Sequence, residues 1–168
     1  DADRDGDVDI YEANGYDVSS EAPEPQQNIL FLNDGAGNFT EATESGLNEA
    51  HAYSSGSTWG DFDNDGDLDI LLNGRRYESY FAHVYRNDSG VFTNINAGLP
   101  GGTGDTAAWG DYDNDGDLDI LLTGYTGTGV ISSVFRNDNG VFTNINAGLT
   151  GVTQGSIAWG DFDNDGDL

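Results

Sequence analysis

The sequence predicts an all-β fold that is built from repeated four-stranded antiparallel sheets. Three observations lead to this prediction. An acidic motif recurs four times along the 168 residues, as is typical of repeat architectures. Short apolar runs alternate with turns rich in Gly, Asn and Asp, which is the pattern of hairpin-connected strands. Patterns that favour helices are scarce, and the chain contains 25 glycines. Each unit is too small to bury a core alone, so we expect the units to pack in series.

The acidic motif is clearest in residues 61–69, which read D-F-D-N-D-G-D-L-D. Carboxylates at every odd position of a strand would lie on one face, where each pair about 5 Å apart costs roughly 3 kcal/mol at an effective dielectric near 20. The chain offers little countercharge, since it has five arginines and no lysine. The stretch is therefore expected to curl around a cation, with Gly66 at the sharp turn. Several hard oxygen ligands on a flexible loop favour Ca²⁺ over Mg²⁺.

Related stretches begin at residues 1, 111 and 161, and the fourth copy ends at position eight of the motif. We predict one Ca²⁺ in each of the three complete loops, and we expect a fourth ion to be one ligand short. Asn64, between two of the acids, is expected to face solvent. The candidate ligands are Asp1, Asp3, Asp5, Asp7, Asp9, Asp61, Asp63, Asp65, Asp67, Asp69, Asp111, Asp113, Asp115, Asp117, Asp119, Asp161, Asp163, Asp165 and Asp167.

The third unit shows the expected strands most clearly. A strand at 106–112 enters the acidic loop, and the nearly continuous apolar run 118–123 leaves it. Such a run is typical of a strand that is covered on both faces. Two further strands, 130–136 and 141–145, flank the tight-turn sequence Asn-Asp-Asn-Gly at 137–140. Four short strands joined by turns predict one antiparallel sheet per unit.

The second unit repeats the third almost letter for letter, whereas the first contains a polar insertion at 12–27. We expect one repeat domain, or a fragment of one. Its divisions are a partial blade 1–50, two blades 51–100 and 101–150, and the start of a further blade 151–168.

Composition limits the classes of partner. The net charge of −26 argues against nucleic acid and against anionic membranes. The absence of cysteine excludes a disulfide framework, and the sequence shows neither a signal peptide nor a membrane span. Calcium loops of this charge suit a compartment with millimolar calcium, so we expect an extracellular, secreted or cell-surface protein.

The stretch W-G-D-F-D-N-D-G-D-L-D-I-L-L, followed by a hairpin with R-N-D-x-G-V-F, resembles the FG-GAP/VCBS repeat family. Members of this family form blades of integrin-α-like calcium-binding β-propellers. The resemblance implies that each loop joins the first two strands of a blade and holds one Ca²⁺. It implies side-chain ligands at positions one, three, five and nine, and the backbone carbonyl at position seven. Three units are fewer than the usual four to eight blades of a closed propeller.

The loop sequence also permits two other interpretations. Residues 1–12 also fit an EF-hand, with Glu12 at the last ligand position. However, Leu72 and Leu122 stand at that position in the other units, and strands are expected around them. A metal-free acidic turn would leave the clustering of charge unexplained.

Two other repeated features are expected to be structural. Trp59, Trp109 and Trp159 each precede Gly-Asp, and we expect them to pack between neighbouring sheets rather than stack on a ligand. Arg86 and Arg136 occupy equivalent places next to a hairpin turn, where a local ion pair is expected.

The leading functional hypothesis is a structural and adhesive scaffold without catalytic activity. His51 and His83 are isolated, and bound calcium would occupy the paired acids. The apolar runs 70–72 and 120–122 are expected to line two open sheet faces, so the expected partners are copies of the chain or the rest of a longer parent chain.

One alternative is a lectin-like module that binds carbohydrate through the connectors 100–106 and 150–156 and the turn 77–81. A second alternative is a non-catalytic accessory region of a secreted enzyme. Asn38 and Asn87 lie in N-glycosylation sequons, so a glycan is a further expected partner.

Overall fold

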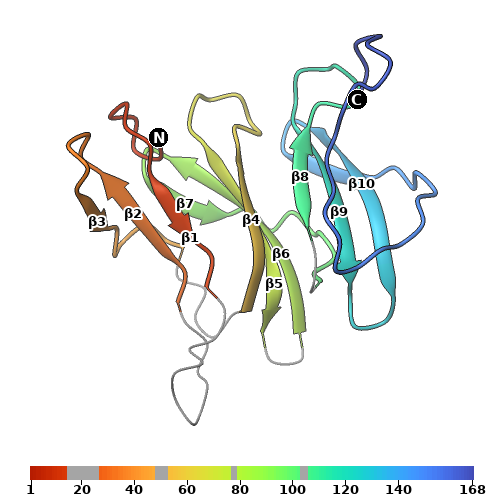
Figure 1. Cartoon of the computed structure of the whole chain (residues 1–168), viewed down its shortest axis with the longest axis horizontal. Helices are drawn as coiled ribbons and strands as arrows, with labels where there is room; N and C mark the ends of the chain where they lie inside the picture. Colours follow the sequence, from red (N-terminus) through yellow and green to blue (C-terminus); the bar gives the residue numbers. More distant parts are fainter. Residues whose placement is uncertain (15–26, 48–52, 77–78, 103–105) are drawn as a thin grey trace.

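The computed structural model describes residues 1–14, 27–47, 53–76, 79–102 and 106–168. These residues form three antiparallel sheets that stand side by side in chain order (Figure 1). No helix occurs in the described ranges, so the all-β prediction is confirmed there and the EF-hand interpretation is wrong. The first sheet contains β1 (Ile10–Glu12), β2 (Ile29–Asn33) and β3 (Phe39–Glu41).

The second and third sheets have four strands each, in the order of the chain. The second sheet contains β4 (Tyr53–Gly60), β5 (Asp69–Arg76), β6 (Ser79–Asp88) and β7 (Val91–Asn94). The third sheet contains β8 (Ala107–Gly110), β9 (Asp119–Tyr125), β10 (Val130–Asp138) and β11 (Val141–Asn144). Residues 151–168 follow without an assigned strand.

The last hairpin of each four-stranded sheet closes in a two-residue turn. Ser89 and Gly90 have φ values of 53° and 91°, and Asn139 and Gly140 have values of 53° and 84°. Two successive residues with positive φ are the mark of a type I′ turn, whose twist matches that of the flanking strands. The Asn-Gly sequence at 139–140 therefore forms the tight turn that its sequence predicts.

Two hydrophobic cores lie on opposite faces of the second sheet. Ile70 and Leu72 belong to the core shared with the first sheet, whereas Leu71 belongs to the core shared with the third sheet. All three side chains are fully buried. The continuous apolar run in this unit thus reflects a strand that is covered on both faces, as predicted.

The expectation that residues 70–72 line an open face is consequently wrong. The open face of the first sheet is instead marked by Ile10, which is 48 % exposed, whereas its counterparts Ile70 and Ile120 are both 0 % exposed. Residues 70–72 are buried because each sheet covers its neighbour, and only the outer sheets retain an uncovered side.

A tryptophan forms the joint between successive units. The ring of Trp109 stacks on Phe62 of the preceding unit, with centroids 6.0 Å apart and planes 7° apart. Trp159 stacks on Tyr112 in the same way, at 6.1 Å and 8°. Trp59 lies at the first core, edge-on to Tyr11 at 6.3 Å. The prediction that the tryptophans pack between sheets is confirmed for Trp59 and Trp109, whereas Trp159 packs on the third unit from a segment without an assigned strand.

The acidic loops all lie along one edge of the row of sheets, at the top of Figure 1. The loops at 61–68 and 111–118 connect β4 to β5 and β8 to β9, respectively. The opposite edge carries the β9–β10 turn and the facing ends of β5 and β6. In the described part of the chain, no helix has the length and hydropathy needed to cross a membrane.

Candidate functional site

Each acidic loop is shaped by two left-handed residues, at positions four and six. In the second unit these are Asn64, with φ of 59°, and Gly66, with φ of 92°. Asn is among the few residues with a side chain that adopt this region readily, and glycine does so without steric cost. Position four is also left-handed in the other loops, at Arg4, Asn114 and Asn164.

The first aspartate of each loop accepts hydrogen bonds from the backbone across the turn. The N–H of Asp65 donates to Asp61 Oδ1 at 3.1 Å, and the N–H of Gly66 donates to Asp61 Oδ2 at 3.0 Å. The aspartate at position five closes a smaller ring, since the N–H of Asp67 donates to Asp65 Oδ1 at 2.8 Å. These bonds curl the loop so that its acidic side chains converge.

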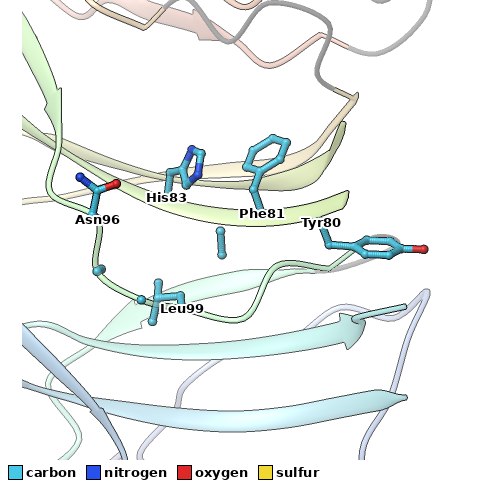
Figure 2. Close-up of a pocket in the computed structure, with 8 residues that line it drawn as sticks. Tyr80, Phe81, His83, Asn96 and Leu99 are labelled. Carbon is cyan, nitrogen blue, oxygen red and sulfur yellow. The ribbon is translucent and has the colours of Figure 1, made fainter. Parts of the chain in front are cut away.

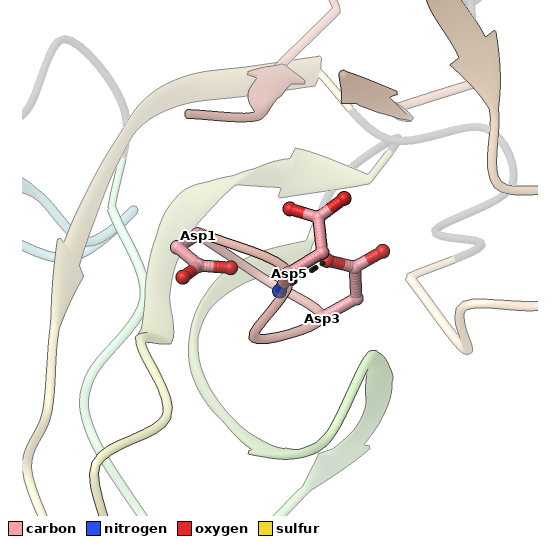
Figure 3. A group of neighbouring side chains, drawn as sticks. All are labelled: Asp1, Asp3 and Asp5. Carbon is pink, nitrogen blue, oxygen red and sulfur yellow. Dashed lines mark hydrogen bonds between the residues drawn. The ribbon is translucent and has the colours of Figure 1, made fainter. Parts of the chain in front are cut away.

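Carboxylates gather in all four loops. In each loop, oxygen atoms from three aspartates lie within 4.8 Å of one another. Figure 3 shows the cluster of the first loop, in which the N–H of Asp5 donates to Asp3 Oδ1 at 3.2 Å. The four clusters are Asp1, Asp3 and Asp5; Asp61, Asp63 and Asp69; Asp111, Asp113 and Asp115; and Asp161, Asp163 and Asp165.

The cluster of the second loop contains a buried oxygen atom without a hydrogen-bond partner, Asp63 Oδ1. Burial, and secondarily the charge of Asp65, raises the pKa of Asp63. A bound cation would remove both causes, because it would solvate the orphaned oxygen and offset the repulsion between carboxylates.

The aspartate at position nine of the motif anchors the loop to the sheet. Asp69 is fully buried, and it accepts hydrogen bonds from the N–H of Phe62 at 3.0 Å and from that of Asn87 at 2.8 Å. Burial raises the pKa of Asp69 to about 7. Asp119 repeats both bonds, with Tyr112 and Asn137, and burial raises its pKa also. In the first loop, Asp9 accepts from the N–H of Asn33 at 2.9 Å.

The side chain of the aspartate at position seven points to the hairpin of its own unit. Asp67 Oδ2 accepts from the N–H of Ser89 at 2.8 Å, and Asp117 Oδ2 accepts from that of Asn139 at 2.9 Å. Among the described residues, position seven, including Asp7 and Asp167, contributes no side chain to the clusters.

A ladder of side chains at position four links each loop to the next. Asn64 Nδ2 donates to the carbonyl of Gly116 and to Asp117 Oδ1, both at 3.1 Å. Asn114 repeats the pair with Gly166 and Asp167, at 3.0 and 2.9 Å. Asn64 is exposed, as expected, and its amide also reaches the neighbouring loop.

Arg4 occupies the same position in the first loop and makes a charged version of this link. Its Nη2 donates to the carbonyl of Asp65 at 2.8 Å, and its Nε pairs with the carboxylate of Asp67. The recurrence of Asn at position four in the other loops was the sequence signal for the ladder. It was missed because a left-handed turn already explains an asparagine there.

A buried asparagine joins each hairpin to two loops. Asn87 is 0 % exposed, and its Nδ2 donates to the carbonyls of Leu68 at 3.0 Å and of Ala2, in the preceding loop, at 2.8 Å. Its Oδ1 accepts from the N–H of Gly90 at 2.7 Å. Asn137 makes the same three kinds of bond in the third unit.

The two arginines beside the hairpins form the local ion pairs that were predicted. Arg86 Nη2 lies 2.9 Å from Asp88 Oδ2, and Arg136 Nη2 lies 2.8 Å from Asp138 Oδ2. Both pairs are about half exposed, so each contributes little to stability.

The fold and the loops together define a class of protein, an all-β repeat protein whose units each carry an acidic loop at the same edge. The model of the FG-GAP-like repeat matches residues 1–72 and 111–168, and the chain belongs to that family. The family recognised in the sequence is thus confirmed. A comparison with curated protein sequences finds no match to the chain.

Proposed function

We propose that the chain is an extracellular calcium-binding scaffold whose units are blades of a β-propeller-type assembly with a structural and adhesive role. The observation that carries the proposal is the convergence of carboxylates in all four loops, with a buried oxygen of Asp63 that has no partner. The membership of the FG-GAP-like repeat family supports the propeller architecture.

The residues of the loops fit Ca²⁺. The donor set consists of oxygen atoms alone, as Ca²⁺ prefers. Positions one, three and five supply side chains in three of the clusters, and position nine replaces position five in the second loop. When bound, the ion supplies positive charge that offsets the repulsion between these carboxylates. The aspartates at positions one and five also hold the turn through backbone bonds, so the ion would rigidify a loop that is already curled.

The open face of the first sheet supports assembly with further units. Ile10 is exposed there, whereas the same position is buried in the two other sheets. A unit of the same kind would cover it as the first sheet covers Ile70. The unit belongs either to the rest of a longer parent chain or to a second copy. Sedimentation of the 168-residue chain in millimolar calcium tests this step, and a monodisperse folded monomer would contradict it.

The extracellular location, the glycan and the absence of a catalytic role also belong to the proposal. Asn38 is exposed and accessible to modification. Asn87 fits a glycan poorly, because its Nδ2 is buried and donates two hydrogen bonds.

His51 lies outside the described residues, and His83 lies between the rings of Phe81 and Tyr85. This packing of His83 suits a structural residue better than a catalytic one.

Calorimetric titration with CaCl₂ tests the calcium component directly. We expect saturable binding at the three complete loops, with a weaker response to MgCl₂ because Mg²⁺ demands stricter octahedral geometry. In a matched variant, Asp61, Asp63 and Asp65 are all replaced by asparagine. This variant should lose the calcium site of the second loop. Equal heats for this variant and the parent chain would refute the assignment of the loop.

A further inference from the structure

The second and third units are nearly identical over residues 59–72 and 84–99, which match 109–122 and 134–149, and they differ throughout 51–58 and 101–108. Residues 84–99 and 134–149 differ only at two matched pairs, Tyr85 with Phe135 and Ser89 with Asn139. In contrast, residues 75–83 share no amino acid at any matched position with 125–133. A scaffold that keeps its frame and varies the segments at one edge is a usual arrangement of a binding surface.

The variable stretches 75–83 and 125–133 meet at the edge opposite the acidic loops. They form the facing ends of β5 and β6 and the turn between β9 and β10 (Figure 1). Between the two units lies an open cavity of about 540 Å³, which is within the usual size range of ligand pockets. Its lining includes Ser79, Tyr80, Pro100, Thr126, Thr128 and Ile131.

The ring of Tyr80 is held in a fixed orientation at this cavity. It lies edge-on to Tyr125, with centroids 6.0 Å apart and planes at 90°. A Cβ atom at Gly127 would lie 2.6 Å from Tyr80 Cε2, so the glycine permits the turn to approach the ring. Tyr125 Oη in turn donates to the carbonyl of Gly127 at 2.9 Å. Figure 2 shows Tyr80 pointing in a different direction from Phe81 and His83, which lie together along β6.

Besides Tyr80, three of the residues that line the cavity carry side-chain hydroxyls, namely Ser79, Thr126 and Thr128. Thr126 Oγ1 and Thr128 Oγ1 lie 3.3 Å apart, and Ser79 Oγ donates to the carbonyl of Arg76 at 2.9 Å. Among the described residues, none of those that line the cavity carries a formal charge. The net charge of −26 repels anionic ligands, so the lining selects an uncharged ligand with one apolar face and several hydroxyls. These are the properties of a neutral sugar.

We infer that this cavity binds a neutral carbohydrate. The apolar face of the sugar packs on the ring of Tyr80, and its hydroxyls exchange hydrogen bonds with Ser79, Thr126 and Thr128. The matched position of Tyr80 in the third unit is Val130. The site therefore belongs to the second unit and its neighbour, and is not repeated in every unit.

Saturation-transfer NMR with the full chain tests the inference. The probes are the methyl glycosides of glucose, galactose, mannose and N-acetylglucosamine, with the charged methyl glycoside of sialic acid for comparison. We expect transfer to at least one neutral glycoside and none to the charged one. Tyr80→Ala should weaken that binding by about tenfold or more, whereas Tyr80→Phe should retain it. Val130→Ala is the position-matched control and should bind as the parent chain does.

The outcomes separate this inference from the calcium scaffold. Calcium titration of Tyr80→Ala should match the parent chain, because Tyr80 pairs with Arg75, near the end of β5 that is distant from the acidic loop. If calcium fails to bind but Tyr80-dependent sugar binding persists, the calcium proposal fails and the sugar site stands. The sugar site is overturned if no neutral glycoside shows transfer, if the charged glycoside alone does, or if Tyr80→Ala binds like the parent chain.

Discussion

Asn64 Nδ2 lies 3.1 Å from Asp117 Oδ1, although the two residues are 53 positions apart in the sequence. The other oxygen of Asp117 accepts from the backbone of Asn139 in the same unit. One carboxylate thus joins its own hairpin to the loop of the preceding unit, so the stability of one loop depends on its neighbour.

Asn64→Gly should loosen this link without straining the turn, since glycine keeps the positive φ that Asn64 adopts. Two exposed hydrogen bonds are lost, which should lower the free energy of unfolding by about 1 kcal/mol. Calcium affinity should fall more in the loop 111–118 than in the loop 61–68. Denaturant unfolding and calcium titration measure the two effects.

The control is Asn164→Gly, at a residue with a similar φ of 61° whose side-chain amide makes no hydrogen bond within the described part of the chain. This variant should unfold like the parent chain. Equal destabilisation by both variants would show that the ladder contributes nothing.

Removal of calcium should lower the melting temperature steeply. Each independent site that is held at about a hundredfold over its Kd adds roughly 2.7 kcal/mol to the stability of the folded chain. Differential scanning calorimetry in excess EDTA, compared with millimolar CaCl₂, measures this shift. An unchanged melting temperature in chelator would be incompatible with structural calcium.

Asp63→Asn and Asp67→Asn should separate ligand from anchor. Asp63 Oδ1 is the buried oxygen without a partner, so its replacement should weaken calcium binding to that loop by about tenfold, or 1.4 kcal/mol. The Asp67 side chain accepts from Ser89 instead, so its replacement should cost about 1 kcal/mol of stability and leave calcium affinity nearly unchanged. Titration and unfolding of both variants check the assignment, and the reverse pattern would contradict it.

Gly60→Ala should disrupt the joint between units. An added Cβ would lie 2.6 Å from Trp109 Cδ1, and overpacking of this kind costs about 1–3 kcal/mol. Gly160→Ala is the control at the same place of the repeat, since no atom lies within 4 Å of the Cβ it would add. Chemical denaturation of the two variants should show a loss for Gly60→Ala alone.

Local patterns predicted much of the fold. The turn chemistry at 139–140 and the period of the acidic motif depend on adjacent residues, and these signals were sufficient to predict hairpins and curled loops. The run Ile70-Leu71-Leu72 correctly indicated a strand covered on both faces, but it could not show which neighbours cover it. The open face had to be found from the arrangement of the sheets.

The sequence predicted which residues make up the candidate site. It did not predict which aspartates gather in the clusters and which hold the loop to the sheet. Aspartates at positions seven and nine look like those at one and three, yet Asp67 and Asp69 also hold the loop to backbone groups near Asn87. These partners lie about 20 residues away, beyond what motif spacing reveals. The amide of Asn64 was missed for the same reason, because its acceptor lies in another unit.

The ladder also bears on how such a chain can lengthen. Every complete unit carries both halves of the ladder link, which are a donor at position four and an acceptor at position seven. The last two motif spacings are 50 residues each. A tandem gene duplication of one such segment would bring its own donor and its own acceptor, so it could enter the row in register without evolving a new interface. The near-identity of residues 86–99 and 136–149 is what a recent duplication of this kind would leave behind.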